Sequence, residues 1–349
     1  MLSFRTKGYN GYGVKYSPFY DNKLAVSASA NYGLVGNGRL YILTIQPDGN
    51  ITNDVFFDTQ DGLFDLAWSE MHANQVVTAN GDGSLKLFDI GLGEEGRFPI
   101  MQWREHSREV FSTTWNLVEK TMFASSSWDG TVKLWTPQRK QSMLTLNTTK
   151  PHLPNNCAYQ VVFSPHNPNI LMSVNANSHI QISDTRLPNP EVSDFIGHNG
   201  AETLSCDWNK YRSTVIATGG VDKLIKIWDL RMVPTSDNKQ LVTPKAGPAP
   251  LNQLIGHEFA VRKLVWSPHD GGELLSCSYD MTARVWRDQT DAATRGVQGG
   301  RLTRHGLGKV FGQHREFVVG ADYSLWGEPG WVTTTGWDEM VYVWDSKRL

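Results

Sequence analysis

The sequence predicts an all-β fold built from seven copies of one structural unit. The first observation is a repeated nine-residue segment that begins with an Asp or Asn turn and ends in the apolar-polar alternation of a β-strand. The second is a constant spacing, because the turn Asp or Asn always precedes the end of that strand by six residues. The third is a pair of columns, one of hydroxyl residues and one of histidines, upstream of the turn. A fixed period of this kind is typical of repeat architectures.

The copies follow one another along the whole chain. Five align without gaps, at Gly81–Asp89, Trp128–Thr136, Val221–Asp229, Tyr279–Arg287 and Trp337–Asp345. Two weaker copies, Gly36–Thr44 and Ala176–Asp184, complete the seven. The longest intervals contain segments rich in Pro, Gly, Thr and Gln at 231–252 and 287–312, which we expect to be insert loops outside the sheets. We therefore expect residues 1–349 to form a single domain.

Four copies combine a His, a Ser or Thr, an Asp and a Trp. The hydroxyl lies four residues before the turn Asp, and the His lies 23 or 24 residues before it. The sets are His106, Ser125, Asp129 and Trp135; His198, Thr218, Asp222 and Trp228; His257, Ser276, Asp280 and Trp286; and His314, Thr334, Asp338 and Trp344. This pattern resembles that of WD repeats over essentially the whole chain. The resemblance implies a seven-bladed β-propeller of four-stranded blades, in which each set forms a buried hydrogen-bonded tetrad. Blades one and four lack the His and the Trp.

The recurrence of these sets argues against catalysis and against metal binding. A Ser-His-Asp triad occurs once in a hydrolase, whereas this combination occurs four times, and the four histidines belong to different blades. The three cysteines, Cys157, Cys206 and Cys277, are far apart and form no CxxC pair, which favours a reducing compartment. We expect no enzyme activity, no catalytic residue, no metal and no cofactor.

The last repeat leaves one strand to be supplied from elsewhere. After Asp345 only residues 346–349 follow, which is too few for an outer strand. The N-terminal segment Leu2–Thr6 alternates suitably and precedes the first inner strand near Val14–Tyr16. We expect it to close the ring and to cover the sheet edges that an open ring would expose.

Composition restricts the class of partner. The chain has 349 residues, 13 of them Trp, and is 40% hydrophobic, so it can bury a large core. Lys plus Arg number 33 against 35 Asp plus Glu, so nucleic acid is not expected as a partner. The N-terminus has no apolar signal-peptide region, and no run approaches the roughly 18 apolar residues of a membrane helix.

One face of the predicted propeller carries the candidate binding residues. In WD-repeat propellers the turn before the third strand and the residues just after the repeat His open onto the same face. There we expect the aromatic residues Trp128, Tyr279, Phe317 and Trp337, and the acids Asp61, Glu109, Glu202 and Glu316. Aromatic anchors surrounded by acids suit an amphipathic helix that carries Arg or Lys.

The segments between repeats show a closer resemblance. They include Gln60–Glu70, Glu105–Ser112, Leu204–Arg212, Ala260–His269, Leu275–Thr282 and His314–Gly327. These stretches are similar to the receptor family for the type-2 peroxisomal targeting signal, in its fungal form. The resemblance implies a cytoplasmic receptor that cycles to the peroxisome. Its partners would be the N-terminal helical signal of cargo enzymes, a co-receptor peroxin and docking peroxins at the membrane.

Two other functions stay open at this stage. Another WD-repeat scaffold, for example one that binds a histone tail, would also need an acidic rim for a basic peptide. An enzyme built on a propeller is the second alternative, although no rim position outside the tetrads offers a nucleophile beside a base.

Overall fold

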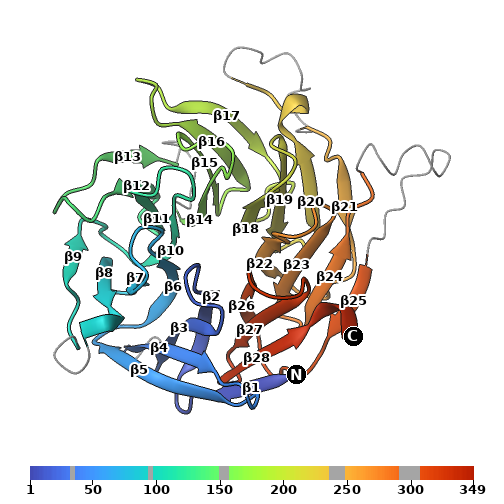
Figure 1. Ribbon diagram of the computed structural model, residues 1–349. Helices are drawn as coiled ribbons and strands as arrows, with labels where there is room; N and C mark the ends of the chain where they lie inside the picture. Colours follow the sequence, from blue (N-terminus) through green and yellow to red (C-terminus); the bar gives the residue numbers. More distant parts are fainter. Residues whose placement is uncertain (32–35, 93–96, 149–156, 236–247, 291–306) are drawn as a thin grey trace.

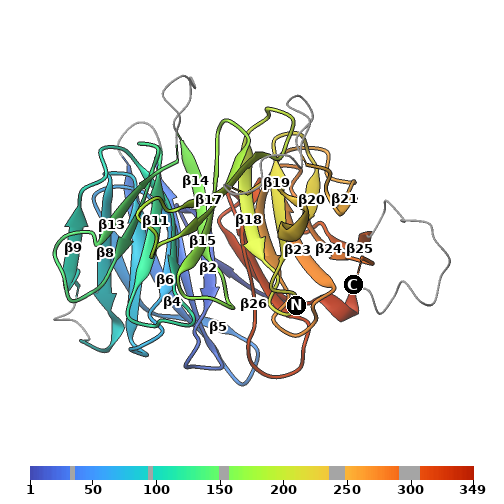
Figure 2. The same cartoon turned by 90° about the horizontal axis from the view of Figure 1, so that it is seen from above.

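The strands form seven separate four-stranded sheets. The structure is a computed structural model, and it describes residues 1–31, 36–92, 97–148, 157–235, 248–290 and 307–349. The sheets are antiparallel blades arranged around a common centre (Figure 1). Viewed from the edge, the strands cross the thickness of the ring (Figure 2). This arrangement confirms the predicted seven-bladed β-propeller.

Each blade contributes one strand to each of four concentric layers. The innermost strands, from blade 1 to blade 7, are β2 (Asn10–Tyr16), β6 (Leu63–Trp68), β10 (Val110–Trp115), β14 (Ala158–Phe163), β18 (Thr203–Trp208), β22 (Val261–Trp266) and β26 (Val318–Tyr323). The second strands are β3 (Lys23–Ala30), β7 (Gln75–Asn80), β11 (Phe123–Ser127), β15 (Ile170–Asn175), β19 (Val215–Gly220), β23 (Glu273–Ser278) and β27 (Trp331–Gly336). The third strands are β4 (Asn37–Ile45), β8 (Ser84–Asp89), β12 (Thr131–Trp135), β16 (His179–Asp184), β20 (Ile225–Asp229), β24 (Ala283–Arg287) and β28 (Met340–Asp345). The outer strands are β5 (Ile51–Thr59), β9 (Met101–Arg104), β13 (Leu144–Asn147), β17 (Glu191–Ile196), β21 (Asn252–Leu254), β25 (Leu307–Phe311) and β1 (Leu2–Arg5). Short 3-10 helices follow some of the third strands, among them η2 (Leu230–Met232) and η4 (Ser346–Arg348).

The turn between the second and third strands has the same backbone in six blades. In blade 3 the N–H of Thr131 donates to Asp129 Oδ1 at 2.9 Å, and Gly130 has a φ of 82°. The residue after the turn Asp or Asn is also left-handed in the other five blades, where it is Gly83, Ser178, Lys223, Met281 or Glu339. Asp and Asn favour such turns because their side chains hydrogen-bond to the backbone two residues on. The turn therefore fixes which residue of each repeat is presented at the face of the ring.

The N-terminal strand closes the ring, as predicted. β1 pairs antiparallel with β28, with Leu2 opposite Val343 and Arg5 opposite Met340. The side chains of Leu2 and Phe4 pack against the buried cluster that includes Tyr41 and Val341. β1 therefore provides blade 7 with both an outer strand and part of its apolar contact with blade 1.

Four chains of hydrogen bonds run through blades 3, 5, 6 and 7. In blade 5, Trp228 Nε1–H donates to Thr218 Oγ1 at 2.8 Å, this hydroxyl contacts His198 Nε2 at 2.9 Å, and His198 Nδ1 contacts Asp222 Oδ1 at 2.8 Å. The other three sets are linked in the same order, with distances between 2.6 and 3.2 Å. Burial alone would raise the pKa of Asp129, but hydrogen bonds from His106 and Thr131 hold it well below its usual range. The hydrogen bonds of each tetrad therefore compensate for the burial of its polar side chains.

In three blades a buried Lys or Arg side chain lies beside the turn carboxylate. This cationic residue is in the third strand, four residues after the turn Asp. Lys86 Nζ lies 3.6 Å from Asp82, Lys226 Nζ lies 3.8 Å from Asp222, and Arg284 donates to Asp280 at 3.2 Å. Lys226 is the most enclosed, with 3% of its side chain exposed, and its ammonium donates to the Gly197 carbonyl at 2.7 Å. Asp222 thus contacts both the buried His198 ring and the buried Lys226 ammonium.

Asp222→Ala is expected to lower the free energy of unfolding by about 3–5 kcal/mol. The change removes the acceptor of His198 and the counter-charge of Lys226, and an unpaired buried charge is costly. Asp222→Asn is the matched control, since it keeps an acceptor for His198 and should lose less. Urea unfolding followed by tryptophan fluorescence measures both. A loss below about 1 kcal/mol for the Ala variant would contradict the structural role.

The remaining blades replace the tetrad with other polar contacts. Blade 2 also lacks the His and the Trp, and here Asp82 Oδ1 accepts the N–H of Ser84 at 3.0 Å. In blade 4 a different pair forms, with His179 Nδ1 at 2.6 Å from Asp194 Oδ1. The predicted insert loops need a correction, because β21 begins at Asn252 and β25 occupies Leu307–Phe311. Each blade still requires an outer strand, and segments 236–247 and 291–306 of these two loops lie outside the described residues.

Candidate functional site

We call the face of the ring that carries the turns between second and third strands the upper face. Every innermost strand contains a bulge at its upper end. The pairing with the second strand skips one residue in each blade. The skipped residues are Tyr12, Phe64, Phe111, Tyr159, Leu204, Arg262 and Val319. A bulge re-aims a side chain without breaking the sheet. The seven bulges therefore place one side chain from each blade around the upper end of the ring.

Three of these bulge residues join the predicted rim aromatics into one continuous group. Tyr279 contacts Phe317 and Phe317 contacts Trp337, with ring centroids 4.8 and 5.2 Å apart. The group continues over blades 1 to 3 through bulge residues, with centroid distances of 5.7 Å for Trp337–Tyr12, 5.2 Å for Tyr12–Phe64, 4.9 Å for Phe64–Phe111 and 4.9 Å for Phe111–Trp128. We call these seven residues the aromatic arc. It extends from blade 6 to blade 3, so the structure brings the four predicted rings together.

The arc is partly covered by its own contacts and partly open. Trp128 stacks on Phe111 with an angle of 17° between the planes, and the Arg108 guanidinium lies 5.6 Å from the Trp128 ring. The four predicted rings are all half-buried. The indole N–H groups of Trp128 and Trp337 are buried, and no acceptor among the described residues bonds to them. Rings held in this way keep a fixed orientation, which reduces the entropy lost when a partner binds.

The predicted acids do not gather at one point. Glu109 pairs with its neighbour Arg108 at 3.6 Å, and Glu202 accepts a hydrogen bond from the Tyr159 hydroxyl at 3.1 Å. Both carboxylates lie close enough to Cys157 to raise the pKa of its thiol, although burial is the larger cause. Asp61 lies elsewhere, over blades 1 and 2, and Glu316 is exposed at the edge of blade 7. Two acidic positions therefore border the arc at separate places, Asp61 at one and Glu109 with Glu202 at the other.

Glycines make room for Asp61. A Cβ atom on Gly36 would lie 2.4 Å from Asp61 Oδ1, and one on Gly81 would lie 2.8 Å from it. Blades 1 and 2 thus carry Gly at the turn position where blades 3 and 7 carry Trp128 and Trp337. Because Gly36 and Gly81 carry no side chain, the space beside them is left for the Asp61 carboxylate.

The site offers binding groups rather than reactive ones. Burial raises the pKa of Cys157, and burial together with Glu202 raises the pKa of Tyr159, so both stay protonated at neutral pH. Among the described residues, no three His, Cys, Asp or Glu side chains are placed to bind a metal ion. Aromatic rings with carboxylates beside them can bind a peptide that is apolar on one face and basic at one end.

Sequence comparison identifies the family. Residues 97–136, 189–229 and 248–287 match the model of the WD domain, G-beta repeat. A protein of Komagataella phaffii named peroxisomal targeting signal 2 receptor is 50% identical, and the alignment covers 100% of both chains. The chain belongs to the peroxisomal targeting signal 2 receptor family. The family member of Saccharomyces cerevisiae is 46% identical over 99% of this chain and 100% of its own. Peroxisome biogenesis protein 7 of Arabidopsis thaliana is 39% identical over 97% of this chain and 96% of its own.

The family relationship agrees with the fold and with the character of the site. These relatives are named as receptors or as a peroxisome biogenesis protein. Within the described parts of the chain, no helix is both long and apolar enough to cross a bilayer. Sequence reasoning missed the bulge residues Tyr12, Phe64 and Phe111. The sequence does place an aromatic residue near the start of these three inner strands, but alternation alone does not assign it to the upper face.

Proposed function

We propose that this protein is a cargo receptor that binds the N-terminal type-2 peroxisomal targeting signal helix of matrix enzymes on the aromatic arc. Together with a co-receptor peroxin it delivers them to docking peroxins at the peroxisomal membrane. The observation that carries the proposal is the continuous arc with carboxylates at its border. The names of the family members support it.

The arc and the acids would divide recognition between them. The apolar face of the signal helix lies against Trp128, Trp337 and the rings between them. The basic residue at the start of the helix pairs with Glu109 and Glu202 or with Asp61. A long-chain cation can pair with a carboxylate through its charged end and also lie against an aromatic ring. The Arg262 guanidinium already lies 4.9 Å from the centre of the Phe111 ring. A co-receptor would cover the parts of the helix that the arc leaves in water.

The receptor would move between the cytoplasm and the peroxisome. Binding of cargo in the cytoplasm requires a preformed surface, and the stacked rings of the arc provide one. Release at the peroxisome requires that the affinity can be changed by another protein. A co-receptor that contributes part of the binding surface would allow this, because its departure would weaken the hold on the signal.

Trp128→Ala is expected to weaken binding of a signal peptide by about 2 kcal/mol or more, roughly 30-fold, without lowering the melting temperature. The indole is half-buried on the rim and not in a blade core. Fluorescence anisotropy with a labelled signal peptide, with the co-receptor present, measures the affinity. Phe98→Ala is the matched control, because Phe98 is 79% exposed and lies outside the arc.

The same experiment tests the proposal against another scaffold function. A basic histone-tail peptide of equal length should bind at least tenfold more weakly than the signal peptide. Equal binding of the two peptides would favour the other scaffold function. If Trp128→Ala unfolded the protein while each folded molecule still bound normally, Trp128 would be a core residue and the arc would not be the binding surface.

A further inference from the structure

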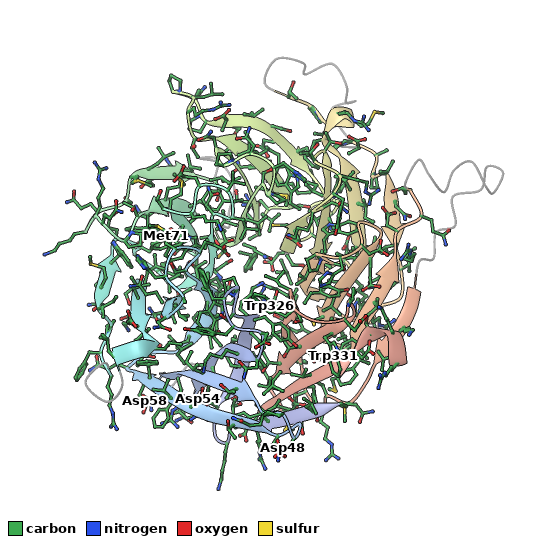
Figure 3. The ribbon with its side chains drawn as sticks, viewed as in Figure 1. Asp48, Asp54, Asp58, Met71, Trp326 and Trp331 are labelled. Atoms are coloured by element: carbon green, nitrogen blue, oxygen red, sulfur yellow. The ribbon has the colours of Figure 1, made fainter. Side chains whose placement is uncertain are left out.

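The face opposite the arc has its own apolar surface around the centre of the ring. The loops between the first and second strands form this lower face. They expose Phe19, Leu117, Val118, Tyr211, Leu325 and Trp326, which we call the lower collar. Trp326 lies near the centre of the ring, and its indole N–H donates to the Ser17 carbonyl of blade 1 at 3.0 Å (Figure 3). Exposed apolar side chains gathered on one face can mark an interaction site.

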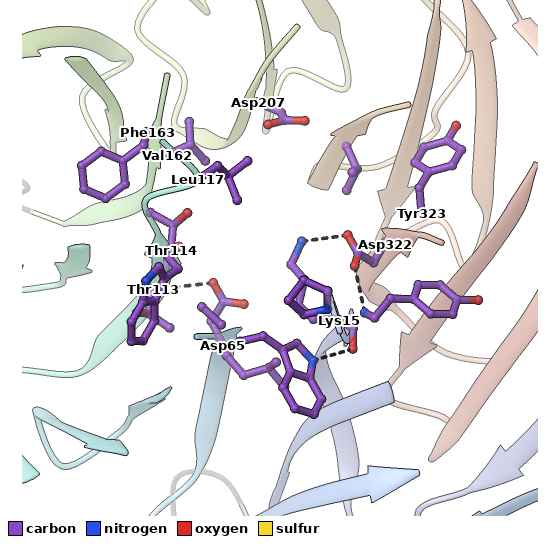
Figure 4. A pocket seen from close by; sticks show the side chains of 18 of the residues that line it. Lys15, Asp65, Thr113, Thr114, Leu117, Val162, Phe163, Asp207, Asp322 and Tyr323 are labelled. Carbon is purple, nitrogen blue, oxygen red and sulfur yellow. Dashed lines mark hydrogen bonds and ion pairs between the residues drawn. The ribbon is translucent and has the colours of Figure 1, made fainter. Parts of the chain in front are cut away.

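A cavity of about 220 Å³ opens within the collar. Leu117, Leu325, Pro18 and Pro268 of the lower-face loops line it. The inner strands contribute Lys15, Asp65 and Asp322, among others (Figure 4). Its inner end reaches Lys263, which also borders the small space beneath the aromatic arc. The lining is mixed, because Glu70 and Lys210 come from the lower-face loops and Lys15, Asp65, Asp207, Lys263 and Asp322 come from the inner strands.

The carboxylates in the cavity already have partners. Asp322 accepts Lys15 Nζ at 2.9 Å and the N–H of Tyr16 at 3.0 Å. Asp207 accepts Lys210 Nζ at 2.9 Å and the N–H of Trp266 at 2.7 Å. These bonds connect blade 7 to blade 1 and blade 5 to blade 6. They hold neighbouring blades together, and they leave Lys15 and Lys210 neutralised.

Lys263 is the cation in the cavity with the weakest partner. Its ammonium lies 4.0 Å from Asp65 Oδ1, beyond hydrogen-bonding distance, and Asp65 Oδ2 is engaged by the N–H of Thr113 at 3.2 Å. Only 12% of the Lys263 side chain is exposed. Burial lowers the pKa of Lys263, and Lys15 and Arg262 add to the effect against the attraction of Asp65. A carboxylate that entered the cavity would therefore complete the hydrogen bonding of a desolvated ammonium.

We propose that the lower collar docks a segment of a partner protein that inserts one Asp or Glu side chain, flanked by apolar residues, towards Lys263. The size of the cavity favours a single side chain, because pockets for drug-sized ligands measure about 300–1,000 Å³. Charge favours a protein over an anionic lipid surface. The Lys and Arg side chains of these loops, which could bind a lipid headgroup, are already paired with carboxylates: Lys120 with Glu70 at 3.7 Å, Lys210 with Asp207 at 2.9 Å and Arg212 with Asp288 at 2.6 Å.

Selection from a display library of random short peptides on the immobilised full-length protein tests the proposal. Each selected peptide is measured against wild type and against Leu325→Asp, and those that lose binding define the lower-face set. These peptides should share one acidic residue beside aromatic or aliphatic residues. Changing that acid to its amide, or Lys263→Met in the protein, should each weaken binding about tenfold, and the two together no further.

Other outcomes would overturn the proposal. A lower-face set without an acidic residue, or additive effects of the two changes, would mean that no carboxylate contacts Lys263. Leu117→Asp provides a second variant at an exposed position, where folding is not at risk, and it should abolish binding as Leu325→Asp does. Flotation with phosphatidylcholine vesicles, with or without phosphatidylserine, that depends on Leu325 would assign the collar to a lipid surface instead. Binding of the type-2 signal peptide should be unchanged in both collar variants, so this test is independent of the proposed function of the arc.

Discussion

Glu109→Lys is expected to weaken binding of a type-2 signal peptide by about 2–5 kcal/mol, which is roughly 30-fold to several thousand-fold. The substitution would place an ammonium where the basic residue of the signal is proposed to lie. It would also set that ammonium beside Arg108, which now pairs with Glu109 at 3.6 Å. If the Glu109 carboxylate were fully solvated, its substitution would cost less than about 1 kcal/mol of binding free energy. The size of the measured loss therefore shows how far the site is desolvated.

A charge-swapped peptide makes this prediction specific. A signal peptide whose leading Arg or Lys is replaced by Glu should bind wild type poorly and recover part of its affinity on Glu109→Lys. All four combinations are measured by fluorescence anisotropy, with the co-receptor present and at two salt concentrations. Glu191→Lys, on the outer strand β17, is the control and should change little. A coupling energy near zero would mean that the basic residue is bound elsewhere, and Asp61, Glu202 and Glu316 would be the next positions to test.

Deletion of residues 1–6 is expected to lower the free energy of unfolding by roughly 3–6 kcal/mol and to cause aggregation. The loss removes the pairing of β1 with β28 and the packing of Leu2 and Phe4 against blade 1. It also exposes the edge of β28, which can pair with another chain. Thermal unfolding and size-exclusion chromatography measure the two effects.

Point variants within β1 separate packing from pairing. Leu2 and Phe4 are half-buried, whereas Ser3 and Arg5 point to solvent. The double change of Leu2 and Phe4 to Ala should therefore destabilise the protein clearly, and the double change of Ser3 and Arg5 to Ala should have a small effect. A deletion variant that melted at the wild-type temperature and eluted as a monomer would show that β1 does not hold the ring closed.

The repeated sequence pattern made the blades predictable. The bulge in each innermost strand made part of the site unpredictable. The turn Asp and the strand that follows have a fixed spacing in all seven copies, so third strands such as β12 could be located from the sequence. Tyr12, Phe64 and Phe111 could not be assigned to the arc, because a bulge shifts the alternation of inward and outward side chains at that point. The sequence therefore predicted the rings at the turns but not the rings that connect them.

Long-range pairing accounts for most of what was missed. Neither the link between Glu202 and Tyr159 nor that between Asp322 and Lys15 has a constant spacing, since the partners come from different blades. The outer strands of blades 5 and 6 follow insertions of different length, so their positions did not repeat. By contrast, the cation four residues after the turn Asp, as in Lys226, recurs in four of the seven copies and could have been found in the sequence.

The antiparallel register that closes blade 7 also determines how the ring responds to force. Leu2 lies opposite Val343, so the outer ends of β1 and β28 lie at the same side of the sheet. Tension applied between these two ends would break the hydrogen bonds between β1 and β28 one after another. It would not load all of them together in shear. A force that drew the two ends of the chain apart would therefore open the ring at blade 7 first, while the six other blades kept their sheets intact.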